Sequence, residues 1–510
     1  MAVTAFRVQN FMGFEDSDWI ELRPITLLFG RNSSGKSALI RALLLLRQSL
    51  ESDPGSGALL FVKDDGYDFG DYAELVKDHD TTKDMSFWFK IEFQRRSDAQ
   101  GEDMYLNLAL ESINDFIIPA SVPVDERPDT QTLTVRLIIG QNTAGSTELK
   151  GLDILDQNGK IVLRADKPEN GDPGVWTVAT DLFELSNPES SFPEVWRSIE
   201  IFSQRGFLPW IRPLENIYRQ IEEDAFRKIG EGVTTPDEVR FFGEDFQNVW
   251  TILRGIRTSL SAFLEKIDYI GPLRASPRRF FYVMGQRAAS PERGRNFVRN
   301  LVQADAETLE SINTWLRAAG MPYRLELQPL DDRKRLYELR LQELSGEQGR
   351  HFSANISEVG FGVTQMLPII TQAVLAQPGD TLIIEQPELH LHPRAQAELT
   401  DLFIAMSRRG LRFLIETHSE HMLLRVRRRI AETTAGMISD GALTHAKPDR
   451  LQAYFIDRLE DGSTAEPIII DSQGKMSNPP GFRGFFADDL QELASLNLAI
   501  LGMQDSEAAR

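Results

Sequence analysis

The chain contains 510 residues, of which 41% are hydrophobic, and it carries a formal net charge of −20 at pH 7. This length allows roughly two to four domains with buried cores, and the absence of cysteine excludes disulfides, thiol catalysis and cysteine-ligated zinc or iron–sulfur sites. The net charge argues against a surface that is basic throughout, although a local basic groove for nucleic acid is still compatible with it.

The first predicted elements surround a glycine-rich segment near the N-terminus. Residues 5–29 alternate apolar and polar positions, as in two strands joined by a short turn. The segment Gly30–Ser37 then fits the pattern GxxxxGK[ST], and a run of helix formers follows it to about Leu50. A strand, a loop of this pattern and a helix are the setting of a nucleotide-binding P-loop.

In a P-loop, backbone N–H groups of the loop and of the helix N-terminus face the phosphates of ATP or GTP. Lys36 is expected to reach the β- and γ-phosphates, and the Ser37 hydroxyl is expected to bind Mg²⁺. The predicted nucleotide-binding residues of this segment are Gly30, Asn32, Ser33, Ser34, Gly35, Lys36, Ser37 and Ala38.

The middle of the chain predicts an antiparallel sheet followed by a helical insertion. Strand-like runs separated by polar turns cover residues 85–93, 104–110 and 133–139. From about Pro188 to Ile267 the apolar residues recur at helical spacing, and one or two further strands are predicted over 325–341. The helical spacing is clearest over 226–229 and 249–264. The expected parts are an ATPase head (1–95 and 319–440), a β-rich subdomain (96–180), a helical insertion (181–318) and a C-terminal domain (441–510).

The second half of the ATP site is predicted from two apolar strands that end in acidic residues. The strand Thr381–Glu385 supplies the distant carboxylate that completes a Mg²⁺ site next to a P-loop. Further along, the strand Phe413–Glu416 is followed by the string Thr417–Ser419. Upstream of both strands, Ile356–Gln365 is a glycine-rich turn that opens a helix.

In this order, the four elements resemble the ABC-type ATPase head, with its P-loop, signature loop, Walker B strand and switch-histidine strand. The chain is similar to the prokaryotic RecF/SMC-like and OLD-like AAA-family ATPases, because Glu385–Pro393 fits E-x-P-E-x-H-L-H-P and Thr417–Ser419 reads T-H-S. Residues 474–493 resemble the short C-terminal domain of unknown function in one subgroup. The resemblance implies an α/β P-loop fold of ABC/SMC-head type with an antiparallel β subdomain and a helical insertion.

The resemblance also implies roles for individual residues. Glu385 takes the Walker B position and shares the Mg²⁺ with Ser37, while His418 senses the γ-phosphate. The signature-loop residues that would face the nucleotide of a second subunit are Gly360, Gly362 and Gln365. Because one chain holds one set of these motifs, complete sites imply a homodimer or a higher homo-oligomer, with two ATP molecules between the heads.

Two positions depart from the pattern of the relatives. Many relatives with strong ATPase activity carry Glu directly after the Walker B acid, whereas this chain has Gln386. An amide can orient water but cannot accept a proton as a carboxylate can, so slow hydrolysis is predicted, with Glu388 as an alternative base. In addition, the signature loop lacks a Ser directly before Gly360, because the nearest one, Ser357, is offset from that position.

Several features allow more than one interpretation. His390 and His392 form an HxH pair that is either a metal site or, as the resemblance explains it, part of the loop after the Walker B strand. The arginines at 425 and 427–429 form either a solvated helix face or a contact for DNA phosphates or a partner. Arg274 either approaches the nucleotide or the dimer seam, or makes a structural ion pair.

The sequence therefore predicts a slow ATPase that acts as a switch and controls a separate effector protein, such as a nuclease or a toxin. The families that it resembles are implied to act in genome maintenance or in defence against phages and plasmids, and defence is the favoured setting. The first alternative is a DNA-binding clamp in repair or recombination, which the net charge does not favour. The second is an ABC transporter subunit, in whose compact head the large insertion has no place.

Two further functions are disfavoured. The segment after His418 is short for a nuclease domain of the chain's own. No run reaches the length of a membrane span, and the N-terminus lacks the pattern of a signal peptide. We therefore expect a cytoplasmic protein without membrane contacts.

Overall fold

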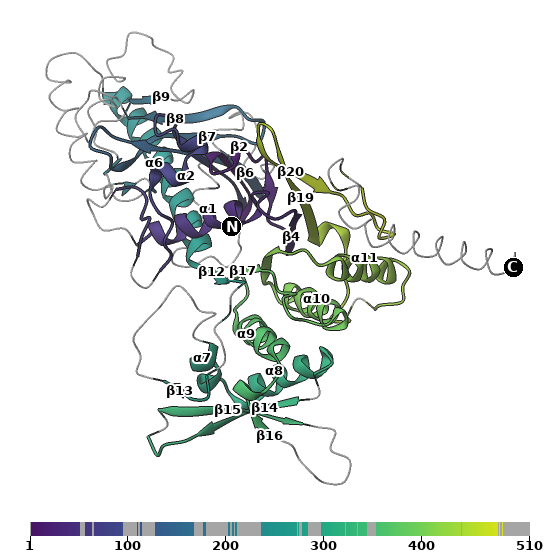
Figure 1. The fold of residues 1–510 in the computed structure, drawn as a ribbon. Coiled ribbons are helices and arrows are strands. Elements are labelled where there is room, and N and C mark those ends of the chain that lie inside the picture. The colour runs from purple at the N-terminus through teal and green to yellow at the C-terminus, as the bar shows by residue number, and fades with distance from the viewer. Residues whose placement is uncertain are drawn as a thin grey trace, which may run out of the picture. The chain divides into compact units, whose positions relative to one another are not determined.

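The computed structural model forms two compact units (Figure 1). The first comprises Met1–Glu21 and Ala38–Ile267, and the second comprises Leu22–Ser37 and Asp268–Arg510. The structure describes residues 2–51, 57–63, 66–94, 110, 113–114, 128–167, 177–179, 202–203, 207–208, 210–211, 236–272, 274, 278–283, 297–321, 323–333, 335–343, 353–439, 441–477, 479 and 482.

The first unit contains an antiparallel sheet whose strand order is β2-β1-β5-β6-β7-β8-β9, with β3 also paired to β1. Buried and partly exposed residues alternate along β5 and β6, as in a sheet that packs a core on one face. The sheet predicted over 85–93 and 133–139 is therefore confirmed, whereas 104–109 lies outside the described residues. The strands are β1 (Ala2–Phe11), β2 (Phe14–Asp16), β3 (Ile20–Glu21), β5 (Met85–Gln94), β6 (Thr130–Gln141), β7 (Thr147–Leu155), β8 (Ile161–Asp166) and β9 (Thr177–Ala179).

The same unit contains the long helix α6 (Pro236–Glu265), which packs against β1. Its second half buries Ile252, Ile256 and Leu260, four residues apart, so one helical face is apolar. The helix predicted over 249–264 is thus confirmed, and 226–229 lies outside the described residues. The smaller elements are the helices α2 (Tyr72–Leu75) and η1 (Lys77–His79) and the paired strands β10 (Phe202–Ser203) and β11 (Trp210–Ile211).

The second unit contains a six-stranded sheet in the order β12-β17-β18-β4-β19-β20. Strands β17, β18, β4 and β19 pair in parallel, and β20 is antiparallel to β19. Every residue of β4 is buried, as expected for a central parallel strand that is covered on both faces. The strands are β4 (Ile25–Gly30), β12 (Ile267–Ile270), β17 (Thr381–Glu385), β18 (Arg412–Glu416), β19 (Leu451–Leu459) and β20 (Gly462–Ile468).

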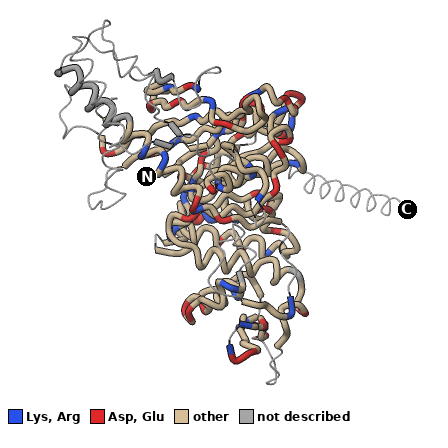
Figure 2. Tube along the Cα trace, turned by 90° about the vertical axis from the view of Figure 1, so that its left-hand side faces the viewer, with Lys and Arg blue, Asp and Glu red and all other residues tan. Residues whose placement is uncertain are grey.

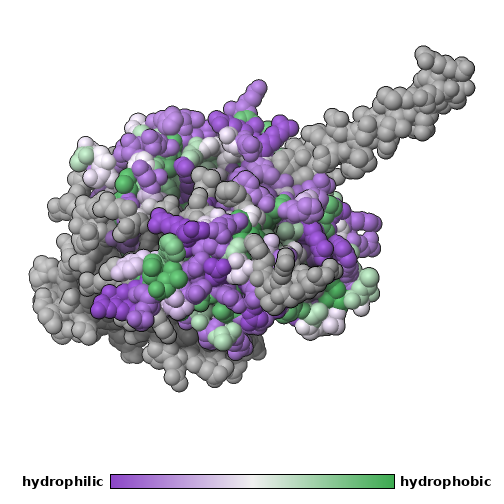
Figure 3. Space-filling model, turned by 60° about the horizontal axis from the view of Figure 1, so that its bottom comes forward, coloured by the Kyte–Doolittle hydropathy of each residue, from purple (hydrophilic) through white to green (hydrophobic). Residues whose placement is uncertain are grey.

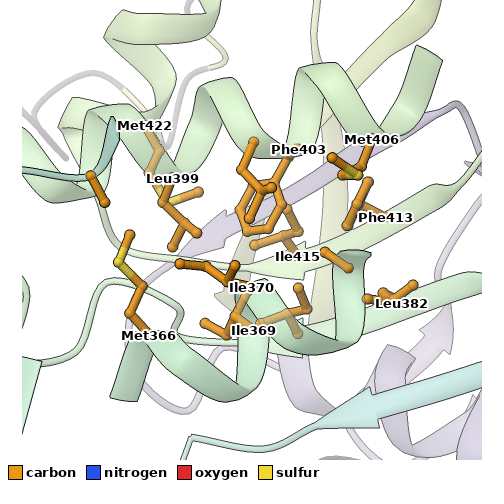
Figure 4. Packing of buried hydrophobic residues seen from close by; sticks show 14 of the residues in the cluster. Met366, Ile369, Ile370, Leu382, Leu399, Phe403, Met406, Phe413, Ile415 and Met422 are labelled. Atoms are coloured by element: carbon orange, nitrogen blue, oxygen red, sulfur yellow. The ribbon is translucent and has the colours of Figure 1, made fainter. Parts of the chain in front are cut away.

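The helices α9 (Phe361–Leu375), α10 (Pro393–Arg408) and α11 (Glu420–Thr434) pack with this sheet in one apolar cluster. Figure 4 shows Ile369 and Ile370 of α9 and Phe403 of α10 directed towards the strand residues Phe413 and Ile415. The rings of Phe403 and Phe413 lie 5.0 Å apart, centroid to centroid. This packing fixes the strand ends from which the loops of the candidate site emerge.

A smaller four-stranded sheet belongs to the same unit, and its strand β15 pairs with β13, β14 and β16. The strands predicted over 325–341 are therefore confirmed, and helix α8 packs on both α9 and β14. The elements are α7 (Phe297–Gln303), α8 (Ala306–Ala318), β13 (Phe281–Tyr282), β14 (Tyr323–Pro329), β15 (Leu336–Glu343), β16 (Ser353–Asn355), η5 (Ile356–Glu358) and η6 (Pro448–Arg450).

The part expected as a C-terminal domain from residue 441 begins with strands of the ATPase sheet. Strand β19 runs parallel to β4, with Leu451 opposite Ile25 and Ile456 opposite Gly30. Residues 451–468 therefore complete the six-stranded sheet. Most of the segment 474–493 lies outside the described residues.

In the described part of the chain, acidic residues lie near basic ones and hydrophobic residues lie near hydrophilic ones. Acidic and basic residues are both scattered along the chain trace (Figure 2), and hydrophobic residues are interspersed with hydrophilic ones on the face shown in Figure 3. Within the described ranges, no helix combines the length and the apolar character that crossing a membrane requires.

Candidate nucleotide-binding site

The P-loop connects β4 to α1 (Lys36–Ser49) in a tight turn. Ser33 (φ 61°) and Gly35 (φ 108°) have positive φ, so the chain reverses just before the helix begins. Gly30 has no room for a side chain, because a Cβ there would lie 2.2 Å from the main-chain oxygen of Ile456. The buried Ser34 hydroxyl finds no hydrogen-bond partner within the described chain. This geometry presents the helix N-terminus and a buried polar group, which fit an anion.

Lys36 is the first residue of α1, and only 3% of it is exposed. Its ammonium donates hydrogen bonds to the main-chain oxygens of Gly30 (3.0 Å) and Arg31 (2.7 Å). Burial lowers the pKa of Lys36, and the negative charges of nearby carboxylates oppose that shift. Those carboxylates belong to Glu416, Glu388 and Glu385. The predicted phosphate ligand therefore lies among three acidic side chains.

Ser37 contacts Glu416, an acid for which the sequence motifs predict no role. Its hydroxyl donates a hydrogen bond of 2.9 Å to Oε2 of Glu416, the last residue of β18. Oε1 of Glu416 lies 3.9 Å from the ammonium of Lys36. Glu416 is 4% exposed, and burial raises its pKa, although the hydrogen bond from Ser37 and the charge of Lys36 act in the opposite direction.

Glu385, the predicted Walker B acid, is the register partner of Glu416 on the neighbouring parallel strand β17. Paired residues of adjacent strands point to the same face, so the two carboxylates lie side by side at one sheet edge. The hydroxyl of Tyr269 donates a 2.8 Å hydrogen bond to Oε1 of Glu385. Glu416 therefore contacts Ser37 directly, and Glu385 lies next to Glu416 on the neighbouring strand.

Gln386 follows Glu385 in a left-handed conformation with φ 44°, which a residue with a long side chain rarely adopts. Its N–H donates to the main-chain oxygen of Glu416 at 2.7 Å. Nη2 of Arg274 donates to the main-chain oxygens of Glu385 (3.0 Å) and Gln386 (3.2 Å), and Nη1 donates to Gln365 (3.4 Å). Burial lowers the pKa of Arg274 to about 10, so the guanidinium stays protonated at neutral pH. Arg274 therefore contacts the loop that follows the Walker B strand, and its approach to the nucleotide or the dimer seam stays a prediction.

Glu388 and His418 are joined by a main-chain hydrogen bond. The N–H of His418 donates to Oε1 of Glu388 at 2.6 Å. Burial raises the pKa of Glu388, whereas burial and the positive charge of Lys36 lower the pKa of His418. The neutral imidazole is therefore favoured, and it lies close enough to Lys36 for the two groups to interact. Ser419 caps α11 by accepting from the N–H of Met422, which fixes the loop after His418.

The predicted signature loop opens α9, with Gly360 as its N-cap. A Cβ on Gly360 would meet no atom within 4 Å, whereas one on Gly362 would lie 3.2 Å from the main-chain oxygen of His390. Gln365 is 6% exposed and contacts Arg274. The first turn of α9 thus lies against the loop that follows the Walker B strand of the same chain. The contact of these residues with a second subunit stays a prediction.

The HxH pair and the arginine run have structural contacts. Nδ1 of His392 accepts from the N–H of Arg394 and caps α10, and in the described ranges no three His, Asp or Glu side chains gather where they could hold a metal ion. Each arginine of the run makes an intramolecular contact. Arg425 pairs with Glu398, Arg427 donates to the main-chain oxygen of Gly474, and Arg428 and Arg429 pair with Glu432, while Arg429 also pairs with Asp401.

The residues present fit a nucleotide with Mg²⁺. The helix N-terminus, the buried Ser34 hydroxyl and Lys36 suit phosphate groups. The Ser37 hydroxyl and the carboxylates of Glu385 and Glu416 are oxygen donors, which Mg²⁺ prefers. A bound Mg²⁺ would neutralise part of the phosphate charge.

Sequence reasoning missed two residues of this arrangement, Glu416 and Tyr269. The sequence does carry one signal for Glu416, since it ends an apolar strand in the same way as Glu385. The signal becomes specific only with the strand order, which puts β18 between β17 and β4. Tyr269 lies in β12, far from the motifs in the sequence, and nothing in its surroundings marks it.

Comparison with solved structures finds SMC heads at low similarity, each with 10% sequence identity. The match to the SMC head domain from Thermotoga maritima covers 92% of this chain and 99% of that structure, with a TM-score of 0.33. The match to an Smc head bound to the C-winged helix domain of ScpA covers 92% of this chain and 98% of that structure, with a TM-score of 0.39. The match to an Smc head with an extended coiled coil, bound to the C-terminal domain of ScpA derived from Pyrococcus furiosus, covers 91% of this chain and 96% of that structure, with a TM-score of 0.37. A comparison with curated proteins gives no match.

The sequence also matches two models of protein families. The family "AAA domain" matches residues 6–165, which include the P-loop. The family "AAA domain, putative AbiEii toxin, Type IV TA system" matches residues 144–424, which include the Walker B and T-H-S strings and more than half of the chain. Both matches confirm the expected α/β AAA-family P-loop protein. The chain belongs to the AAA-domain family that carries this second description.

Proposed function

We propose that this chain is an ATP-dependent switch that binds ATP with Mg²⁺ and hydrolyses it slowly. The observation that carries the proposal is the convergence of Lys36 and Ser37 on the carboxylate of Glu416, with His418 close enough to Lys36 for their charges to interact. Lys36 would bind the β- and γ-phosphates, and the neutral imidazole of His418 would offer its ring N–H to the γ-phosphate. The remaining phosphate contacts would come from the N–H groups at the start of α1.

Slow turnover is expected from the groups available to the attacking water. Gln386 can hold a water molecule through its amide but cannot take its proton. Glu388 is the alternative base, and its raised pKa suits proton acceptance, but Oε1 already accepts from His418 N–H. An amide in place of a carboxylate directly after the Walker B acid favours a long-lived ATP state, as a switch requires.

We further propose that two chains form a homodimer through composite ATP sites and that the ATP state controls a partner effector in anti-phage or anti-plasmid defence. One P-loop and one signature loop per chain support the dimer. The family description names a putative toxin of a type IV toxin–antitoxin system, and this supports the defence setting. The alternative is a DNA-binding clamp, for which the arginines at 425 and 427–429 carry less weight because they already make intramolecular contacts.

The test is the molar mass of the purified chain by light scattering after gel filtration, with and without ATP and Mg²⁺. Wild-type protein is expected to double its mass with ATP and Mg²⁺, and Lys36→Ala is expected to stay monomeric. A parallel assay measures phosphate release, which should be slow in the wild type and lost in Lys36→Ala. A mass that does not respond to ATP would refute the composite-site dimer, and an absence of nucleotide binding would refute the switch itself.

A further inference from the structure

The P-loop serine has an acidic partner on the strand between the P-loop and the Walker B strand. Ser37 Oγ donates its single proton to Oε2 of Glu416 at 2.9 Å. A hydroxyl that binds a metal ion uses an oxygen lone pair and keeps its proton for a second contact. The Glu416 contact therefore leaves the Ser37 lone pairs available, and it fixes the direction in which they point.

An ion pair with Lys36 does not account for the buried charge of Glu416. The two groups are 3.9 Å apart, which exceeds a hydrogen bond, and the Lys36 ammonium donates to the oxygens of Gly30 and Arg31 instead. Burying a carboxylate at 4% exposure costs free energy unless partners offset the lost hydration. A structural role could be filled by an uncharged acceptor at lower cost, so the charge itself calls for an explanation.

The negative charge of Glu416 has a consequence for nucleotide binding. The carboxylates of Glu385, Glu388 and Glu416 all act on Lys36, so they offset part of the positive charge that it offers to a phosphate. ATP alone would bring further negative charge into the same place. A divalent cation between the phosphates and the strand-end carboxylates would reverse that repulsion.

We propose that Glu416 is a metal-site residue: it orients Ser37 towards the divalent cation of the nucleotide and makes nucleotide binding depend on that cation. This inference rests on the proposed function, because it concerns the same ATP site. In metal sites, groups that hold a ligand in place are worth roughly 10- to 100-fold in metal affinity. Glu416 is a positioning residue for Ser37 and a source of negative charge that ATP without a cation must overcome.

The test uses the full chain and a fluorescent ATP analogue, whose anisotropy reports binding in EDTA and across a Mg²⁺ titration. In Glu416→Gln, the Mg²⁺ concentration at half-maximal effect should rise by about tenfold or more, while binding in EDTA should become tighter. The matched control is Glu460→Gln, which removes the same charge from an exposed residue at the β19–β20 turn and should behave as the wild type.

Ser37→Ala provides a second measurement on the same contact. Because Glu416 is proposed to act partly through Ser37, Glu416→Ala, which removes the acceptor as well as the charge, should raise the half-maximal Mg²⁺ concentration less in the Ser37→Ala background than in the wild type. Glu416→Gln with unchanged Mg²⁺ dependence, or equal effects of Glu416→Ala in both backgrounds, would overturn this inference alone. Wild-type protein that binds no nucleotide in either condition would overturn the proposed function together with the inference.

Discussion

Arg274 connects the start of α9 to the loop after the Walker B strand, and Arg274→Ala should slow ATP hydrolysis far more than it weakens ATP binding. Its guanidinium donates to the main-chain oxygens of Glu385 and Gln386 and to the side chain of Gln365. Gln386 has φ 44°, a conformation that costs free energy and persists only when its surroundings hold it. Alanine removes every one of these donors.

The magnitude follows from the two shorter hydrogen bonds, at 3.0 and 3.2 Å. A hydrogen bond from a charged donor contributes about 1.5 kcal/mol, so the pair holds the loop with about 3 kcal/mol. If the loop must keep this conformation during hydrolysis, a loss of that size lowers kcat by about 100-fold. Lys36 and Ser37 keep their contacts, so the Kd for ATP should change by less than about threefold.

The assay is phosphate release at saturating ATP, together with the anisotropy measurement of ATP affinity. Arg274→Lys serves as the matched variant, because it keeps the charge but cannot reproduce the forked geometry, and its kcat should lie between those of the wild type and Arg274→Ala. A kcat within about threefold of the wild type in Arg274→Ala would refute the reasoning, and so would a Kd that rises in proportion to the loss of kcat.

Three further predictions concern single residues of the site. Gln386→Glu restores a carboxylate next to the Walker B acid and should raise kcat about tenfold or more, measured by phosphate release. Burial raises the pKa of Glu416 above its ordinary value of 4.5, so the ionised form costs the wild type stability as the pH rises through that pKa. Glu416→Gln has no carboxyl group to ionise, and its Tm relative to the wild type should therefore increase as the pH rises above 4.5, by about 2 °C. Gly30→Ala places a Cβ 2.2 Å from the main-chain oxygen of Ile456, and it should lower Tm and abolish binding of the fluorescent ATP analogue.

Each of these predictions has its own control. An unchanged kcat in Gln386→Glu would show that this position does not set the rate. A Tm difference for Glu416→Gln that is the same at every pH, or is matched by Glu460→Gln, would contradict the burial argument. Gly441→Ala adds a methyl where no atom lies within 4 Å and should leave Tm and binding unchanged, whereas normal binding by Gly30→Ala would show that the P-loop can shift to accommodate it.

The local parts of the site could be predicted from the sequence because their spacing along the chain determines their chemistry. The P-loop and the strand ending at Glu385 are read from contiguous residues, and the structure forms β4, α1 and β17 at the predicted places. The helix opened by Gly360 is likewise a local signal, since glycine interrupts the chain directly before an apolar helical run.

The contacts between these parts could not be predicted, because they depend on strand order. Glu416 meets Ser37 only because β18 lies between β17 and β4, and a single sequence does not reveal which strands are neighbours in a parallel sheet. Arg274 follows β12, and its role was left open for the same reason. The place of β19 beside β4 was also hidden, since its alternating residues fit a separate hairpin equally well.

The pairing of β4 with β19 has a consequence for synthesis of the protein. The P-loop strand ends at Gly30, and its two neighbours in the sheet, β18 and β19, begin at Arg412 and Leu451. A growing chain on the ribosome must therefore keep the apolar strand β4 unpaired until nearly all of the described residues have been made. The sheet around the ATP site therefore cannot form before β19 has been synthesised, so any activity that depends on ATP would begin only after β19 has emerged from the ribosome.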